Sequence, residues 1–346
     1  MTHAPRPAFW LGDLSAALIQ APMAGGPSTP ALAAAVGRAG GLGFLAGGYL
    51  SAAALAEQIA LVRGQLGQGP FGVNLFVPRP VAEPESVAAY REALGPEAAR
   101  LGVALPEPDL DDDDGWPEKL DLLLQDPVPV ASFTFGLPED AVLTRLRQQG
   151  TYTVATVTGV QEALAAQSAG VDALCVQGPE AGGHRGVFDP AATPGTAPLE
   201  ELLARIAAVT DLPLIAAGGV GTAADVVRLR GAGAAIVQAG TAFLRAREAG
   251  TAPLHRAALA DPRFTETVLT RAFSGRWART LRNGFTDRHP RAPAAYPAIN
   301  QLTKPLRAEA ARRGDADGLN LYAGLNFRAA LAQPAAEVVT RLTATA

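Results

Sequence analysis

The chain has 346 residues, of which 48% are hydrophobic and 18% charged, and its formal net charge is −4. This length suits one large barrel with added segments or two modest domains, and the acidic balance argues against the basic surface that nucleic acid binding requires. The single cysteine, Cys175, excludes an intramolecular disulfide and a zinc site built on several thiolates.

The N-terminus and the most apolar stretch give no sign of export or membrane insertion. Residues 1–10 hold two prolines and no long apolar core, unlike a secretory signal. Ala31–Leu50 contains six glycines and Arg38, which indicates a helix, a turn and a strand rather than a membrane span. We therefore expect a cytoplasmic protein with no membrane or nucleic acid partner.

Eight short apolar runs, bounded by Gly, Pro or Asp, are predicted to be buried parallel strands. They are Ala17–Gln20, Gly43–Ala46, Phe71–Phe76, Val128–Phe135, Tyr152–Val157, Ala173–Gln177, Leu214–Ala217 and Ala235–Gln238. Helical patterns separate them; for example, Thr222 can cap a helix that starts near Ala223. This alternation favours an α/β fold, and eight strands suffice for a (β/α)8 TIM barrel. A doubly wound sheet is the competing architecture.

Two stretches interrupt the alternation. Residues 78–117 contain a predicted helix, Glu83–Leu94, and an acidic run, Asp111–Asp114, that is either a solvated loop or a cation site. Residues 243–330 are rich in Arg, Pro and Asn, and we expect an irregular lid there. The predicted organisation is a ligand-binding barrel at 1–242, a lid or substrate-binding segment at 243–330, and a C-terminal part at 331–346 with a helix near Ala335–Leu342 that packs on the barrel.

Glycine clusters follow four of the predicted strands, at the end of a barrel where ligands bind. They lie in Gln20–Gly26, Gln177–Gly186, Ala216–Gly221 and Gln238–Phe243. The last two follow the seventh and eighth strands, the common position of a phosphate site in barrels, where bare N–H groups attract an anion. The alternative is that these glycines only make tight turns. The Gly218–Gly221 cluster is not followed by a dinucleotide-type G-x-G-x-x-G or by an acidic residue at the expected distance, which argues against a Rossmann site, and no Walker A pattern is present.

One of the four histidines, His184, lies in a glycine-rich loop directly after a predicted strand. A neutral imidazole there could remove a proton from a substrate carbon; the alternative is a solvent-exposed loop histidine. No second histidine stands at metal-ligand spacing, so no metal site is predicted. Cys175 lies inside a strand, which favours a core residue over a nucleophile.

Taken together, these motifs resemble those of the class I nitronate monooxygenases, formerly called 2-nitropropane dioxygenases. The resemblance covers residues 20–324. The matching pieces are Gln20-Ala21-Pro22-Met23-Ala24-Gly25-Gly26, Phe71-Gly72-Val73-Asn74-Leu75, Ser132-Phe133-Thr134-Phe135-Gly136, Gly182-Gly183-His184-Arg185-Gly186, Ala217-Gly218-Gly219, Gln238-Ala239-Gly240-Thr241-Ala242-Phe243, Phe273-Ser274-Gly275-Arg276-Trp277-Ala278-Arg279, Tyr296-Pro297, Thr303-Lys304-Pro305 and Tyr322-Ala323-Gly324. The chain departs from the family at Tyr322 and Leu325, where the family often has tryptophan and glutamine, and in the acidic insert near Asp111.

The resemblance implies a flavoprotein that holds FMN at the barrel mouth. His184 matches the catalytic histidine of the family, and Tyr296 and Lys304 match positions near the substrate. The remaining matched positions are expected to contact the cofactor. These are Met23 and Asn74 at the flavin ring, Gln177 and Gly182 at the ring or ribityl chain, and Gly219, Gln238, Ala239, Gly240 and Thr241 at the phosphate.

The activity implied by the resemblance is oxidation of alkyl nitronates, such as propionate 3-nitronate, by O2 to a carbonyl compound and nitrite, in detoxification. Lys304 suits the negative charge of a nitronate. The alternatives are an NAD(P)H-dependent flavin reductase acting on quinones or enoyl thioesters, a flavin-free barrel that binds a phosphate ligand, and a non-catalytic binding barrel. The sequence leaves both a monomer and a homodimer open.

Overall fold

Eight parallel strands form a closed barrel in the computed structural model, which describes residues 9–79 and 84–344. The strand order is β1-β9-β8-β6-β5-β4-β3-β2, and a bridge between Ile19 and Leu42 joins the first strand to the second. The strands are β1 (Leu18–Gln20), β2 (Gly43–Ala46), β3 (Phe71–Phe76), β4 (Val130–Thr134), β5 (Tyr152–Val157), β6 (Ala173–Gln177), β8 (Leu214–Ala217) and β9 (Ile236–Ala239). The predicted TIM barrel is confirmed, and the doubly wound alternative is wrong.

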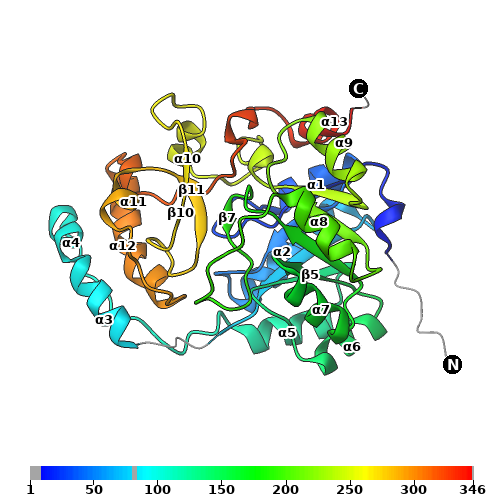
Figure 1. Ribbon diagram of the computed structural model, residues 1–346, viewed down its shortest axis with the longest axis horizontal. Helices are drawn as coiled ribbons and strands as arrows, with labels where there is room; N and C mark the ends of the chain where they lie inside the picture. Colours follow the sequence, from blue (N-terminus) through cyan, green and yellow to red (C-terminus); the bar gives the residue numbers. More distant parts are fainter. Residues whose placement is uncertain (1–8, 80–83, 345–346) are drawn as a thin grey trace.

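Helices surround the barrel and bury its outer face (Figure 1). They are α1 (Pro30–Arg38), α2 (Ala52–Leu66), α5 (Trp116–Gln125), α6 (Asp140–Gln148), α7 (Val160–Ala169), α8 (Leu199–Ala207), α9 (Ala223–Gly231) and α13 (Ala335–Thr343). The predicted cap of α9 is confirmed, because the Thr222 side chain accepts a hydrogen bond from the Asp225 N–H. The C-terminal helix α13 packs against α1 and α9.

The barrel interior is filled by apolar side chains from the strands. Tyr152 and Cys175 lie within it, and Phe9, whose ring centroid is 5.9 Å from that of Tyr152, packs against this interior cluster. Cys175 is only 3% exposed, and burial raises the pKa of its thiol to about 12. A thiol that stays protonated is a poor nucleophile, in agreement with the core role predicted for it.

A second region, the outer lobe, lies beside the barrel mouth and is built mainly from two separate parts of the chain, with a short strand from the loop after β6 added to its sheet (Figure 1). Its apolar core joins side chains from both parts, among them Tyr90, Leu94, Phe273, Phe285 and Leu302. The elements of the outer lobe are α3 (Pro84–Ala93), α4 (Gly95–Leu101), α10 (Pro253–Ala258), α11 (Gly284–Arg288), α12 (Ala298–Arg312), and a three-stranded antiparallel sheet of β10 (Thr267–Thr270), β11 (Ala278–Leu281) and β7 (Gly183–His184).

The expectation of an irregular segment at 243–330 was wrong. Helix α12 runs for 15 residues although Pro305 lies inside it, and its apolar residues Ile299, Leu302 and Leu306 are buried in the outer lobe. Tertiary burial therefore outweighs the helix-breaking tendency of proline. The predicted helix Glu83–Leu94 corresponds to α3, but its first residue, Glu83, lies outside the described residues.

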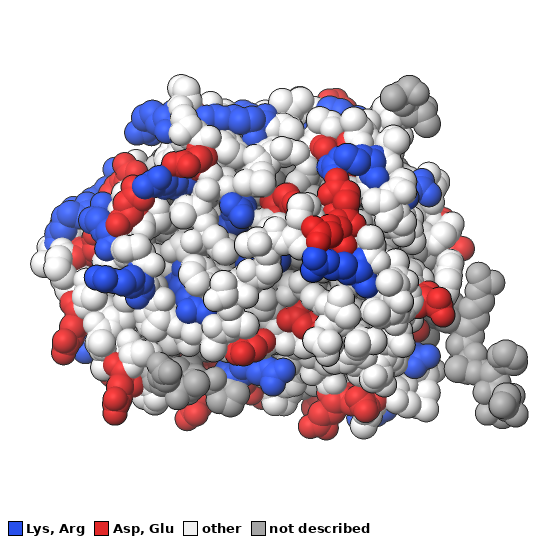
Figure 2. All heavy atoms as spheres, in the orientation of Figure 1, with Lys and Arg blue, Asp and Glu red and all other residues white. Residues whose placement is uncertain are grey.

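The short 3-10 helices are η1 (Leu11–Asp13), η2 (Thr241–Phe243), η3 (Ala316–Gly318) and η4 (Phe327–Ala329). Within residues 9–79 and 84–344, no helix has the length and hydrophobicity to cross a membrane. Over the same residues, His, Cys, Asp and Glu form no group of three that could hold a metal ion. Figure 2 shows acidic and basic side chains interspersed on the face that it displays.

Candidate active site

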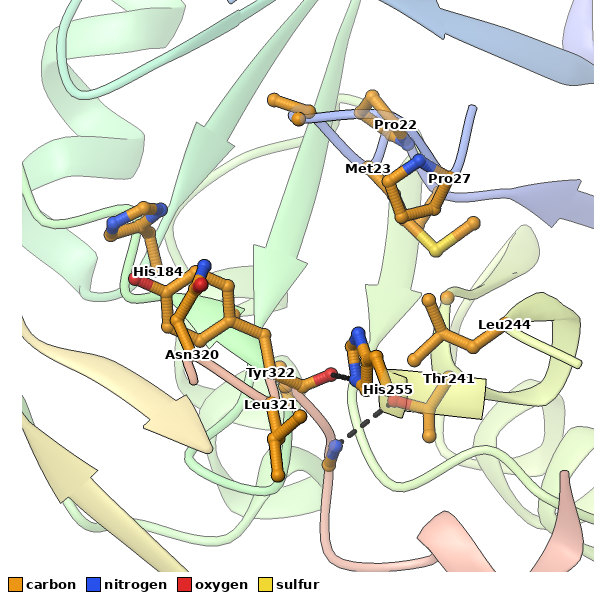
Figure 3. Close-up of a pocket in the computed structure, with 18 of the residues that line it drawn as sticks. Pro22, Met23, Pro27, His184, Thr241, Leu244, His255, Asn320, Leu321 and Tyr322 are labelled. Carbon is orange, nitrogen blue, oxygen red and sulfur yellow. Dashed lines mark hydrogen bonds between the residues drawn. The ribbon is translucent and has the colours of Figure 1, made fainter. Parts of the chain in front are cut away.

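A cavity of about 630 Å³ lies at the carboxyl ends of the barrel strands, between the barrel and the outer lobe. This volume falls within the range of about 300–1,000 Å³ typical of cofactor and ligand pockets. The loops after β1, β6, β8 and β9 supply one wall, and residues of α10, α12 and the segment 319–326 supply the other. Figure 3 shows Met23, Pro22 and Pro27 facing Tyr322 and His255 across this space.

The cavity brings together residues that are spread over most of the chain. Of the predicted site residues, those that line it are Met23, Asn74, Gln177, Gly182, His184, Gly219, Gln238, Ala239, Gly240, Thr241 and Lys304. Tyr296 is not a lining residue. Its ring lies behind the wall, with its centroid 6.0 Å from that of His184 and 6.4 Å from that of Tyr49.

Glycines form one end of the cavity, after β8 and β9. Gly218 and Gly219 have φ of +133° and +67°, conformations that other residues rarely adopt. The hydroxyl of Thr241 accepts a hydrogen bond of 2.9 Å from the Gly324 N–H (Figure 3). A side chain at Gly182 would collide with the backbone of Ala323 and Gly324. The glycines therefore let three loops approach one another and leave a cradle lined largely by backbone.

Two side-chain amides, the buried Asn74 and the half-buried Gln177, organise the strand ends. The Asn74 side-chain amide donates to the hydroxyls of Ser132 and Thr134, at 2.9 and 3.0 Å. Gln177 donates to the His184 carbonyl at 2.9 Å and accepts from the Gly186 N–H at 2.8 Å. Because Gln177 holds both sides of this loop, it fixes the backbone on which His184 stands.

His184 lies in the two-residue strand β7, which pairs with β11 of the outer lobe. Its Nε2 is 2.8 Å from the Ser274 hydroxyl, which orients the ring and leaves Nδ1 for a ligand. The ring centroid is 5.2 Å from that of Tyr322 and 5.8 Å from that of Phe135. Burial, together with the positive charges of Arg276 and Arg307, lowers the pKa of His184 to about 3. The imidazole is therefore neutral at physiological pH.

The charge of the cavity wall is positive. Lys304 and Arg307, both on α12, line the cavity, and no aspartate or glutamate of the described residues does. Arg307 is held by neutral partners: it donates to the Asn300 side-chain and backbone oxygens at 2.7 and 3.0 Å and to the Asn320 amide oxygen at 3.3 Å. Its guanidinium makes no ion pair among the described residues, and burial lowers its pKa. This wall is suited to an anion.

Sequence reasoning did not single out several residues of this wall. Arg307 is three residues after Lys304, which places both on neighbouring positions of a helix face, but no helix was predicted there. Tyr49 follows β2 after two glycines, and its place just beyond a strand was the available signal. His255, whose Nε2 is 3.1 Å from the Tyr322 carbonyl oxygen, is half-buried, and desolvation lowers its pKa to about 4. No local pattern marked His255.

The comparisons with known proteins agree with this geometry. The family model described as nitronate monooxygenase matches residues 11–345. The chain is 37% identical over 318 residues to a probable nitronate monooxygenase of Staphylococcus saprophyticus, covering 90% of this chain and 89% of that protein. It is 36% identical over 330 residues to a probable nitronate monooxygenase of Staphylococcus aureus, covering 94% and 92%.

Solved structures give the same result. A nitroalkane oxidase from Streptomyces ansochromogenes superposes with a TM-score of 0.93 at 46% identity, covering 96% of each chain. FabK from Thermotoga maritima superposes with a TM-score of 0.71 at 22% identity, covering 96% of this chain and 93% of that one, a likeness of fold. Since the family model spans nearly the whole chain and the relatives exceed 30% identity over most of it, this protein belongs to the nitronate monooxygenase family and is an oxidoreductase.

Proposed function

We propose that this protein is an FMN-dependent enzyme that oxidises alkyl nitronates with O2 to a carbonyl compound and nitrite. The observation that carries the proposal is the make-up of the cavity wall. A neutral, half-buried histidine lines the cavity together with a lysine and an arginine that makes no ion pair among the described residues, and no carboxylate of those residues lines it. Such a wall favours a small organic anion over a neutral or cationic substrate.

The glycine end of the cavity fits the phosphate of FMN. Gly219, Gly240 and Thr241 would hold the phosphate with backbone N–H groups and one hydroxyl, and the neighbouring Gln238 and Ala239 complete this end. An added side chain at Gly240 would fill the cradle toward Met23. Met23 and Asn74 would lie against the flavin ring, with Gln177 and Gly182 at the ring or ribityl chain. When bound, FMN supplies the redox chemistry, accepting electrons from the organic substrate and delivering them to O2.

The substrate anion would lie against α12. Arg307 is already oriented by Asn300 and Asn320, and one N–H of its Nη1 has no acceptor among the described residues and would donate to a nitronate oxygen. Lys304 is exposed at the same wall and adds a second positive charge. We propose that the outer lobe serves as the lid of the cavity, because it carries both cations and the β11 strand that pairs with His184.

His184 would act on the α-carbon only when the substrate is a neutral nitroalkane. Its Nδ1 would then take the α-proton, while Nε2 keeps its contact with Ser274. A base with a pKa of about 3 is weak for this step. A preformed nitronate has already lost that proton, so the low pKa favours nitronate as the better substrate.

The proposal can be tested by steady-state assays of FMN-loaded protein. We expect propionate 3-nitronate to drive O2 uptake and nitrite release without any nicotinamide. Nitroethane should be turned over more slowly. A protein that consumed O2 only when NADPH was added, and released no nitrite from the nitronate, would instead be a flavin reductase.

A further inference from the structure

The acidic run, which the proposed function does not use, contacts a residue of the cavity wall. We propose that Asp114 and the buried Lys119 are positioning residues that hold Tyr49 as the wall of the substrate end of the cavity. In this role the acidic segment sets how tightly a small anion is bound. The inference rests on the proposed function for the nature of the substrate.

Tyr49 has a backbone conformation that requires support. Its φ is +68°, which is rare for a bulky side chain and persists only where the surroundings impose it. The ring lines the cavity, with its centroid 5.8 Å from that of Phe76 and 6.4 Å from that of Tyr296. Phe76 and Tyr296 in turn pack beside His184, with centroids 6.5 and 6.0 Å from its ring. A displaced Tyr49 would therefore open the wall next to His184.

Asp114 supplies that support. Its Oδ1 accepts a hydrogen bond of 2.8 Å from the Tyr49 N–H, and its Oδ2 lies 2.7 Å from the ammonium group of Lys119. The Lys119 side chain is 1% exposed, so its charge depends on Asp114 for a partner. Asp114 has a positive φ of its own, +61°, and its N–H donates to Asp112 at 2.9 Å. Two contacts therefore hold the carboxylate of Asp114, and the bond to Asp112 holds its backbone.

The same segment is fastened to the helix that carries the cations. Gln301 of α12 donates to the Asp112 carboxylate at 2.7 Å and accepts from the Asp109 N–H at 2.7 Å. Gln301 lies on α12 just before Lys304 and Arg307. The segment therefore links Tyr49, on the barrel side of the cavity, to the cationic residues of α12 on the lobe side. It fixes the distance between these two sides. This accounts for the acidic run without a bound cation.

The test uses a matched pair of double variants, because removing Asp114 alone would leave the Lys119 charge buried without a partner. D114A/K119M removes the acceptor for the Tyr49 N–H. D114N/K119M keeps an oxygen at that place and changes Lys119 in the same way. D111A is the control, since Asp111 is exposed and its side chain makes no hydrogen bond or ion pair with any residue that the structure describes. Q301A severs only the link to α12.

Two readouts are needed on FMN-loaded protein. One is the KM and kcat for propionate 3-nitronate, and the other is the Kd for nitrite, from the change in flavin absorbance without turnover. We expect D114A/K119M to raise both KM and Kd about tenfold, with kcat and FMN affinity within about twofold. D114N/K119M should stay within about threefold of wild type, Q301A should raise both about threefold, and D111A should change neither.

The decisive comparison repeats D114A/K119M in a Y49A background. If Asp114 acts through Tyr49, the added change in Kd should be less than twofold. Equal effects of the two double variants, or a full tenfold effect in the Y49A background, would overturn the inference. A wild type that bound nitrite but did not oxidise the nitronate would contradict the proposed function alone, because the Kd series would still decide the role of Asp114. A wild type that bound no nitrite would contradict both.

Discussion

The barrel and the outer lobe differ in how their sequences encode structure and in what they contribute to the cavity. Each barrel strand is a local run of buried apolar residues, and its loop carries glycines that bring the backbone close to a ligand. The outer lobe is assembled from residues 84–101 and the segment after β9, which meet only in the folded protein. The barrel supplies the cradle of backbone for a cofactor, and the lobe supplies the charges for a substrate. Substitutions in the barrel should therefore impair cofactor binding, and substitutions in the lobe should impair substrate binding.

The largest effect is expected in the barrel at Gly182. Gly182→Val places a side chain where the backbone of Ala323 and Gly324 lies. The loop would have to move, so FMN binding and all activity should be lost. The measurement is the flavin content of the purified variant and its FMN titration. Gly159→Ala is a suitable control, because a Cβ added there has no atom of the described residues within 4 Å. Full flavin occupancy in Gly182→Val would contradict the assignment of Gly182 to the part of the cavity that holds the cofactor.

His184 stands where the two regions meet, since β6 leads to it and β11 pairs with it. His184→Asn should lower kcat/KM for nitroethane by about 10³, a typical contribution of general base catalysis. Turnover of the preformed nitronate should fall by about tenfold or less. The comparison of the two substrates in one assay tests the role directly. Equal losses on both would show that His184 does not act as the base.

Arg307 tests the lobe alone. Arg307→Met should raise the KM for propionate 3-nitronate about 100-fold, as expected when a charge-assisted contact to an anion is lost, while FMN affinity stays near that of wild type. Arg312→Met on the same helix is the control, because Arg312 is exposed and pairs with Glu309. A loss of FMN with Arg307→Met would place this residue at the cofactor instead of the substrate.

The smallest effect concerns stability against pH. The pKa of His184 is lowered to about 3 and that of His255 to about 4, both mainly by burial. In the unfolded chain these imidazoles take up protons as pH falls below about 6.5, whereas in the fold they stay neutral until pH 3–4. The unfolded state thus binds more protons in this window, and stability falls as pH decreases from about 6.5 toward 4. We expect Tm to fall by several degrees from pH 7 to pH 5.

The variants His184→Asn and His255→Asn provide the check, since each should flatten the dependence of Tm on pH. A flat profile in the wild type would mean that these histidines are protonated without cost in the fold. Burial also lowers the pKa of His289, which contacts Glu97. Some dependence of Tm on pH should therefore persist in a variant that carries both substitutions.

The sequence predicted the barrel well because its signals are local. All eight predicted strands are present, and their ends differ from the prediction by at most two residues. The outer lobe was not predictable in the same way. Pro305 interrupted the helical pattern of α12, and the pairing of His184 with β11 joins residues nearly 100 positions apart. Local patterns carry no information about such contacts.

The residues of the candidate site also fall into two groups, those marked by local sequence patterns and those placed by tertiary contacts. The glycines and His184 stood out because they follow strands, and the structure places them around one cavity. Arg307, Tyr49 and His255 depend on tertiary contacts and went unnoticed. Tyr296, expected near the substrate, lies behind the wall, where its ring packs between Tyr49 and His184. The acidic run shows a similar limit, because its link to Tyr49 spans 65 residues.

The central claim is that the cavity holds a flavin at its barrel end and oxidises an anion held at its lobe end. Mixing FMN-loaded protein with propionate 3-nitronate in the absence of O2 tests it most directly, with NADPH added to a second sample. We predict that the nitronate alone bleaches the flavin absorbance and that nitrite appears once air is admitted. Bleaching by NADPH alone, or a purified protein that binds no FMN, would contradict the account.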